Sequence, residues 1–203
     1  AIAWGIDPPR GLALRPAVAA DRDLRLAVFA AARDAERRAA GWPEALWTAF
    51  VADQFAKREA HWARVHPPAE VLVLEAAAPA LPPARIVPAA DRRLAPVGTL
   101  TLVVEEAPDA GADEDATPAT ARIARVGRIV DVALLPEARG RGFGTSLVES
   151  LARAARRTGL GALVLDVHAI NTDAARFYRR LGFHRVDHPG PATHHRMVRP
   201  LTR

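Results

Sequence analysis

The chain has 203 residues, of which half are apolar and a quarter are charged, a balance that suits one ordinary globular domain and excludes wholesale disorder, collagen and coiled coil. It contains no cysteine, which excludes disulfides, thiolate metal sites and a cysteine nucleophile. The formal net charge is +5, but aromatic residues make up only 5% of the chain, so nucleic-acid binding is a weak interpretation.

The first ten residues are expected to be an N-terminal extension, followed by a short strand over residues 11–17. Asp21 or Asp23 can cap the next helix, and apolar residues at spacings of three and four predict that this helix extends over residues 22–40. The apolar stripe of the helix consists of Leu24, Val28, Ala31 and Ala35.

Gly41 is a natural end for that helix, and a second helix is predicted to begin at Pro43. Two prolines, beginning at Pro67, end the second helix before a strand over residues 70–76. The buried face of the second helix is predicted to comprise Leu46, Phe50, Val51, Phe55 and Trp62.

Two segments of biased composition interrupt the middle of the chain. Residues 78–96 contain five prolines and no periodicity, which predicts a loop before a strand over residues 97–105. Residues 105–120 then carry six acidic side chains and no basic one, which predicts a mobile hairpin loop. A sharper interpretation is that this acidic loop overhangs an active site and attracts a cationic substrate.

From residue 121 onward the pattern alternates between strands and helices. The predicted elements are a strand over 123–135, a helix over 142–158, a strand over 162–169, a helix over 172–181, and strands over 183–186 and 195–199. A strand, a helix and a further strand in succession place the two strands parallel. The predicted fold class is therefore α/β or α+β, with one mixed central sheet and helices on both faces.

Three alternating glycines, Gly140, Gly142 and Gly144, open the helix that follows the strand and Pro136. Backbone amides in such a turn and in the first helical turn lack partners, and the helix dipole adds to their attraction for a phosphate group. The spacing is not the dinucleotide fingerprint, because its third glycine would stand at Thr145. It is not the nucleotide-triphosphatase loop either, since no lysine precedes a serine or threonine there.

The motif Arg139-x-x-Gly142-x-Gly144 resembles the acyl-CoA pyrophosphate loop of the GNAT superfamily of N-acetyltransferases. A second motif resembles the family's later one, at the usual separation: Asn171-x-x-Ala174-x-x-Phe177-Tyr178-x-x-Leu181-Gly182-Phe183. The resemblance covers residues 121–188 closely and the first half of the chain less specifically. It implies that residues 11–203 form one GNAT-like domain with a sheet of six to seven strands, two of which splay apart at the acyl-CoA site.

The resemblance also implies a set of residues that bind acetyl-CoA. Backbone groups exposed where the strands splay would hold the pantetheine arm, and the loop amides would bind the pyrophosphate, with a surface contact from Arg141. Asn171 would either hydrogen-bond the pantetheine chain or merely cap the helix that follows it. The residues carried over are Val132, Ala133, Leu134, Arg139, Gly140, Arg141, Gly142, Phe143, Gly144, Thr145 and Asn171.

Tyr178 matches the tyrosine that, in many family members, protonates the departing thiolate, and it is the only tyrosine in the chain. The alternative is a packed aromatic residue with a satisfied hydroxyl group. The attacking amine must lose a proton, so a base is expected near the acetyl carbon. Asp166 is the first candidate, Asp131 the second and Glu105 the third, and each has an alternative interpretation as a strand-end ion pair.

Together these residues predict an enzyme that transfers an acetyl group directly from acetyl-CoA to a primary amine of a small molecule or peptide. The alternative function is a non-catalytic acyl-CoA-binding regulatory module. No metal is expected, because the spacing of the four histidines near the C-terminal end matches no known ligand set. These histidines are His184, His188, His194 and His195.

The expected partners are acetyl-CoA and the amine acceptor, with no nucleic acid and no membrane. The chain has no apolar run long enough for a spanning helix, and its first residues lack the pattern of a secretory signal. We therefore expect a cytoplasmic protein, and the sequence leaves a homodimer open.

Overall fold

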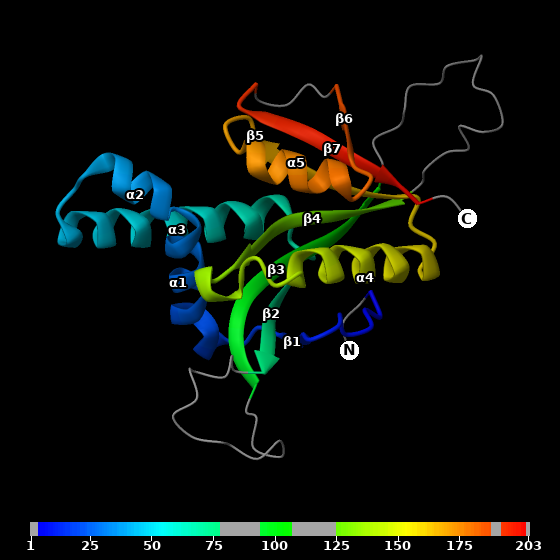
Figure 1. Cartoon of the computed structure of the whole chain (residues 1–203), viewed down its shortest axis with the longest axis horizontal. Coiled ribbons are helices and arrows are strands. Elements are labelled where there is room, and N and C mark those ends of the chain that lie inside the picture. The colour runs from blue at the N-terminus through cyan, green and yellow to red at the C-terminus, as the bar shows by residue number, and fades with distance from the viewer. Residues whose placement is uncertain (1–3, 78–93, 107–124, 188–191, 202–203) are drawn as a thin grey trace. The chain divides into compact units, whose positions relative to one another are not determined.

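The computed structural model describes residues 4–77, 94–106, 125–187 and 192–201. Hydrogen bonds order the strands β1-β2-β3-β4-β5-β7-β6 in one sheet (Figure 1). This confirms the predicted central sheet, which has seven strands in the described residues. The strands are β1 (Ala13–Pro16), β2 (Glu70–Ala77), β3 (Leu94–Glu106), β4 (Arg125–Leu134), β5 (Ala162–His168), β6 (His184–Val186) and β7 (His194–Pro200).

The chain divides into two compact units, and β3 and β4 each have residues in both. The helical unit comprises Pro8–Thr101 and Asp131–Gly144, and the C-terminal unit comprises Ala1–Asp7, Leu102–Val130 and Thr145–Arg203. Within the described residues, no helix is both long enough and apolar enough to cross a membrane. That residues 11–203 act as one acetyltransferase domain stays a prediction.

The helix predicted over residues 22–40 is two helices, α1 (Arg22–Ala32) and α2 (Asp34–Ala40). They separate at Arg33, whose amide donates to the carbonyl of Ala30, three residues back, and so closes α1 with a tightened turn. The predicted end is confirmed, because Gly41 follows α2 with a left-handed φ of 60°.

Asp21 stands at the N-cap position of α1, but its side chain does not cap the helix. Both carboxylate oxygens accept hydrogen bonds from Arg15, at 2.7 and 2.8 Å. One of them also accepts from the amide of Val18, at 2.8 Å. The predicted capping role is therefore wrong for Asp21, because two nitrogens of the Arg15 guanidinium, on β1, bind the carboxylate instead.

This ion pair predicts a stability that depends on pH. The Arg15 hydrogen bonds, followed by that of the Val18 amide, lower the pKa of Asp21 to about 2. The contribution of the carboxylate is therefore present above pH 4 and is lost as the pH falls towards 2. We expect Asp21→Asn to lower the free energy of unfolding at pH 7 by about 1 to 3 kcal/mol.

Urea unfolding of both proteins between pH 2 and 7 measures this effect, and the difference between them should shrink below pH 4. Asp53→Asn is the matched control, since Asp53 forms an exposed ion pair with Lys57 on α3, which is worth little. A difference between Asp21→Asn and the original protein that stays constant down to pH 2 would contradict the assignment.

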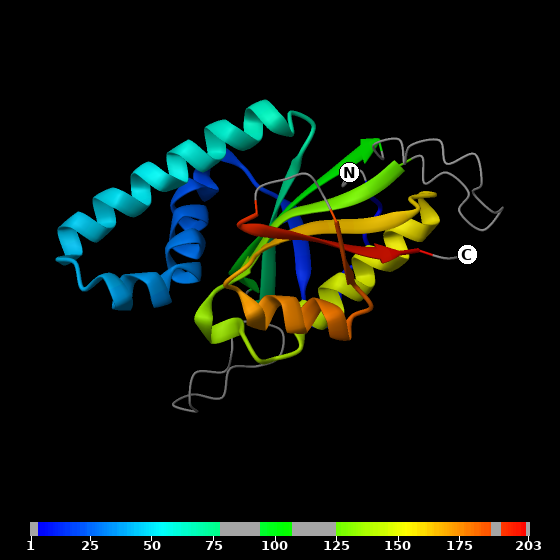
Figure 2. The same ribbon diagram turned by 90° about the horizontal axis from the view of Figure 1, so that it is seen from above.

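The second predicted helix is α3 (Glu44–Val65), and its start after Pro43 is confirmed. Val51 and Phe55 are buried as predicted, but Trp47 is buried in place of Leu46, which is 60% exposed. Trp47, Val51 and Phe55 form one apolar cluster with Phe29 of α1. Figure 2 shows α1 and α2 leading into the long α3. The packing against α1 therefore decides which face of α3 is buried.

The strand predicted over residues 70–76 is confirmed as β2. The third strand begins earlier than predicted, since β3 starts at Leu94 and includes Pro96. Most of the proline-rich loop and the acidic loop, over residues 78–93 and 107–124, lie outside the described residues.

The C-terminal unit contains α4 (Phe143–Arg157), which begins in the helical unit, and α5 (Thr172–Arg180). The predicted parallel pair is confirmed, with Val126 to Ile129 of β4 beside Ala162 to Leu165 of β5. Strand β7 is antiparallel to both β5 and β6. The predicted elements of this half are therefore confirmed in type and order.

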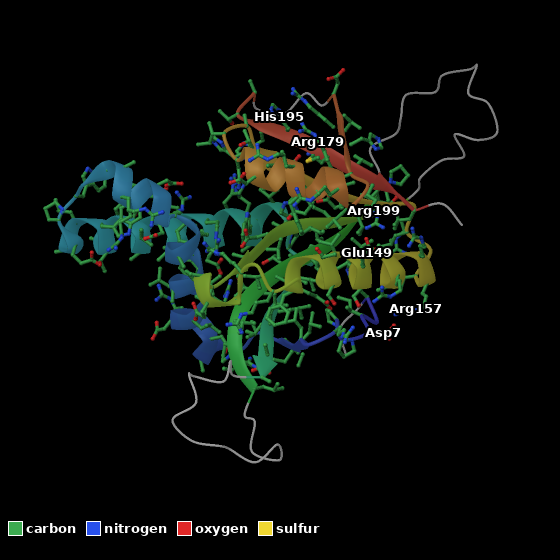
Figure 3. All side chains as sticks on the ribbon, viewed as in Figure 1. Asp7, Glu149, Arg157, Arg179, His195 and Arg199 are labelled. Carbon is green, nitrogen blue, oxygen red and sulfur yellow. The ribbon has the colours of Figure 1, made fainter. Side chains whose placement is uncertain are left out.

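Residues 4–7, which belong to the expected N-terminal extension, contribute to the core of the C-terminal unit. Trp4 is 2% exposed, and it packs so closely on β4 that a Cβ added to Gly127 would lie 2.2 Å from its ring. Figure 3 labels two of the ion pairs of this unit, Asp7 with Arg157 at 2.9 Å and Glu149 with Arg199 at 2.8 Å.

Candidate active site

The segment between β4 and α4 belongs to the helical unit up to Gly144. The amide of Leu135 donates to the carbonyl of Val97 at 2.8 Å, which ties the end of β4 to β3. One turn of 3-10 helix, η4 (Pro136–Ala138), follows, and α4 begins at Phe143. The turn over residues 139–142 is thus held between a strand end and the start of a 15-residue helix.

Gly140 and Gly142 both have left-handed backbone angles, with φ of 72° and 79°. Residues with a Cβ rarely adopt this conformation, so the turn itself requires glycine. A Cβ at either position would have no atom of the described residues within 4 Å. Gly144 lies within α4, so two of the three alternating glycines shape the turn.

The turn offers backbone N–H groups to an anion. Among the described residues, the amides of Gly140, Arg141 and Gly142 have no hydrogen-bond partner. The first amides of a helix also lack an intrahelical acceptor, and the positive end of the helix dipole lies there. These groups fit the diphosphate of coenzyme A, which needs closely spaced donors and no side chain between them and its oxygens.

Arg139 differs from the other residues of the predicted pyrophosphate cradle. Its amide donates to the carbonyl of Pro136 at 3.2 Å, so that amide is already used within the protein. Its guanidinium donates to the carbonyl of Leu134 at 2.9 Å and to that of Ala31 at 3.1 Å. Arg139 therefore ties the turn to β4 and to the last turn of α1.

Val132, Ala133 and Leu134 form the end of β4, beyond the parallel register with β5. The carbonyl of Ala133 faces β3 so closely that a Cβ on Gly98 would lie 2.4 Å from its oxygen. Because backbone groups alternate along a strand, the amide of Leu134 points to the side away from β3. This direction suits the predicted role of an amide near Leu134 as a donor to the thioester carbonyl.

Asn171 caps α5, since its Oδ1 accepts a hydrogen bond from the amide of Ala174 at 3.1 Å. The structure therefore shows the capping role of Asn171, which is one of the two roles that the sequence left open. A bond to the pantetheine chain would use the side-chain NH2 group, and that role stays a prediction.

Tyr178 also lies on α5, in the C-terminal unit, and is 8% exposed. Its ring packs between those of Phe177 and Phe183, with centroids 5.1 and 5.4 Å away. This packing fixes the ring of the only tyrosine in the chain. Its role as an acid stays a prediction.

The first and third candidate bases, Asp166 and Glu105, lie in an ion-pair network of the C-terminal unit. Asp166 accepts one hydrogen bond from Arg128 at 3.0 Å and two from Arg196 at 3.0 and 3.1 Å. Glu105 accepts from Arg128 at 2.7 Å. A carboxylate bound in this way must break a charge-assisted hydrogen bond before it accepts a proton. The ion-pair interpretation therefore describes both residues better than that of a base.

Asp131, the second candidate base, lies on β4 in the helical unit with a side chain that is 29% exposed. Burial raises the pKa of Asp131, and the nearby charges of Arg58 and Arg33 oppose that rise. Its ion pair with Arg58 is long, with 3.4 Å between Nη1 and Oδ2. Asp131 thus combines increased proton affinity with loosely held oxygens, which are properties of a general base.

The sequence reasoning missed Arg58. It lies three residues beyond Phe55 on the buried face of α3, and its side chain is 19% exposed. A charged residue that continues the apolar spacing of a helix is the signal that could have singled it out.

No group of three or more metal-ligating side chains occurs in the part of the chain that the structure describes. His168 and His194 contact each other, with ring centroids 4.9 Å apart. Nδ1 of His195 is buried and has no hydrogen-bond partner among the described residues. His188 lies outside the described residues.

Comparison with solved structures shows where this fold occurs. The chain is similar to the PaiA N-acetyltransferase from Thermoplasma acidophilum in complex with coenzyme A, with a TM-score of 0.56, 15% identity, and coverage of 93% of this chain and 98% of that one. It is also similar to an acetyltransferase from Thermus thermophilus, with a TM-score of 0.57, 22% identity, and coverage of 94% and 97%.

Among curated proteins, the chain is 42% identical over 62 residues to a mycothiol acetyltransferase from Arthrobacter sp. (strain FB24). That match covers 30% of this chain and only 19% of the length of the relative. The family model described as acetyltransferase (GNAT) family matches residues 59–183, which include both motifs. Because this match spans more than half of the chain, the protein belongs to the GNAT family, whose members transfer an acetyl group from an acyl-CoA donor.

Proposed function

We propose that the protein is an acetyl-CoA-dependent N-acetyltransferase that moves the acetyl group directly from the thioester to a primary amine of a small molecule or peptide. The observation that carries this proposal is the turn at Gly140 and Gly142, whose free amides precede the N-terminus of α4. Membership in the GNAT family supports acetyl transfer as the reaction. The amine as acceptor is the step that the proposal adds.

In this proposal the amides from Gly140 to Thr145 bind the diphosphate, and Arg141, which is exposed, adds a charge at its edge. Charge-assisted hydrogen bonds contribute about 1.5 to 3 kcal/mol each, whereas a helix dipole adds only about 0.3 to 1 kcal/mol. The amides therefore dominate donor binding. The amide of Leu134 donates to the thioester carbonyl oxygen, where negative charge develops.

Two side chains handle protons in the proposed reaction. The amine nitrogen forms a bond to the carbonyl carbon and gives a proton to Asp131, directly or through water. The bond between carbon and sulfur breaks, and the Tyr178 hydroxyl donates a proton to the departing sulfur. A thiol with a pKa of about 8.5 leaves as an anion near neutral pH, so a phenol with a pKa of about 10 stabilises it by hydrogen bonding.

We assign the base to Asp131 in preference to Asp166. The two oxygens of Asp166 accept three hydrogen bonds from two arginines, whereas Asp131 has one long contact with Arg58. The amine must be neutral to attack the carbonyl carbon. An amine with a pKa near 10.4 costs about 4.6 kcal/mol to deprotonate at pH 7, so a base is needed. A carboxylate with a raised pKa lowers that cost more than a carboxylate with an ordinary pKa does.

A thiol-release assay with acetyl-CoA and a panel of amines tests the proposal. The panel includes simple alkylamines, a polyamine, free amino acids and peptides with free N-termini. We expect release of coenzyme A that saturates with at least one amine and stays at the hydrolysis background without amine. Tight binding of coenzyme A with no turnover on any acceptor would instead indicate a regulatory acyl-CoA-binding protein.

A further inference from the structure

Arg58 is held among aromatic rings in the helical unit. Its guanidinium carbon lies 4.3 Å from the ring centroid of Phe29, 4.3 Å from that of Trp62 and 5.1 Å from that of Phe55. A guanidinium over an aromatic face is attracted by the ring quadrupole, most strongly where water is excluded. These three rings, from α1 and α3, form an aromatic clamp that fixes the position of the charge.

The polar contacts of Arg58 are weak by comparison. Nη1 lies 3.4 Å from Asp131 and Nη2 lies 3.4 Å from Glu59, at the long limit for hydrogen bonds. Nε is buried and has no hydrogen-bond partner among the described residues. The rings, rather than the carboxylates, therefore determine where this guanidinium lies.

Arg58 is the main electrostatic partner of Asp131, because the other nearby arginines pair with other carboxylates. Arg25 of α1 pairs with Glu59 of α3, and Arg33 pairs with Glu36 at 2.8 Å. Burial lowers the pKa of Arg58 to about 10, against the opposing effect of Asp131, so its side chain still carries its charge at neutral pH. Of the charges that act on Asp131, Arg58 contributes most, followed by Arg33.

We propose that Arg58 is the positioning residue of Asp131: the aromatic clamp holds a guanidinium beside this carboxylate, which keeps the carboxylate ionised and oriented while leaving its oxygens only loosely bound. The contrast is with Arg128, which binds Glu105 at 2.7 Å and Asp166 at 3.0 Å and so occupies their oxygens. The catalytic consequence rests on the proposed function, whereas the effect on the ionisation of Asp131 does not.

Carbon NMR of the full chain without ligand tests the ionisation directly. The Asp131 carboxyl signal is assigned by its loss in Asp131→Asn, and its titration is followed in the original protein, in Arg58→Met and in Arg58→Lys. Arg58→Met keeps an apolar stem between the rings but removes the charge, so we expect the titration midpoint to rise by about one pH unit or more. Arg58→Lys should retain most of the original midpoint.

Arg64→Met is the matched control, because Arg64 lies on α3 and contacts the exposed His61 at 3.3 Å; it should leave the midpoint unchanged. If Arg58→Met does not fold, Trp62→Leu provides a second variant, since it loosens the clamp and keeps the charge. We expect a smaller rise there, of about half a pH unit. An unchanged midpoint in Arg58→Met, or in Trp62→Leu where that variant replaces it, overturns the proposal.

The pH profile of kcat/KM supplies a second readout with an acceptor that turns over. Asp131 accepts a proton only when ionised, so the rate falls as the pH falls through its pKa, and Arg58→Met should move that fall to higher pH. If the NMR midpoint of Asp131 moves in Arg58→Met but no amine is turned over, only the proposed function is overturned. If turnover is normal and Arg58→Met changes neither the Asp131 midpoint nor the pH profile of kcat/KM, only the role of Arg58 is overturned.

Discussion

Replacing Gly142 with valine should weaken the binding of coenzyme A by about 100-fold or more. Its φ of 79° strains any β-branched residue, and the new methyl groups would stand beside the amides that are proposed to bind the diphosphate. Loss of two charge-assisted hydrogen bonds, at about 1.5 to 3 kcal/mol each, accounts for an effect of this size. Isothermal titration calorimetry with coenzyme A measures it.

Gly159→Val is the matched control for backbone strain. Gly159 has a φ of 74°, a Cβ there would also meet no described atom within 4 Å, and it follows the other end of α4. Both variants should lose similar stability in thermal unfolding, while only Gly142→Val should lose affinity for coenzyme A. Full affinity in a folded Gly142→Val protein, or an equal loss in Gly159→Val, would refute the assignment of the turn.

Replacing Tyr178 with phenylalanine should lower kcat by about 100-fold, within the range typical of a lost general acid. The change removes one hydroxyl group and leaves a ring that can pack between Phe177 and Phe183 as before. The affinity for coenzyme A should therefore stay within about twofold, because the hydroxyl is proposed to act on the departing sulfur rather than on binding. Steady-state thiol release and calorimetry measure the two quantities.

Phe177→Leu is the matched control for the packing of this ring. It removes the edge contact between Phe177 and Tyr178 and keeps the hydroxyl group, so we expect it to lower thermal stability while kcat falls much less than in Tyr178→Phe. If kcat of Tyr178→Phe stays within about threefold of the original, Tyr178 is a packed aromatic residue and the acid lies elsewhere.

The glycine turn and the cap of α5 could be predicted from the sequence because both depend on local chemistry. Gly140 and Gly142 adopt left-handed angles that few other residues tolerate. Asn171 binds an amide only three residues away. The spacing of apolar residues likewise predicted the type and order of the helices and strands that the structure describes, except that residues 22–40 form two helices instead of one, since a period near 3.6 or 2 belongs to a single element.

The choice among the candidate bases could not be made in this way. Asp166 lies near the end of β5, as a base at a strand end would, yet Arg128 and Arg196 bind it from positions 38 and 30 residues away. Asp131 meets Arg58 across 73 residues of sequence. Which carboxylate is tied up by arginines depends on which strands and helices become neighbours.

The sequence by itself determined the family motifs, the glycine turn before α4 and most of the succession of elements, because each of these is encoded within a few neighbouring residues. The tertiary structure alone decided that Trp47 rather than Leu46 is buried on α3, since Phe29 of a different helix selects that face. It also decided that Arg58 stands beside Asp131 within an aromatic clamp. Contacts between distant residues depend on how the whole chain packs, and no local pattern specifies them.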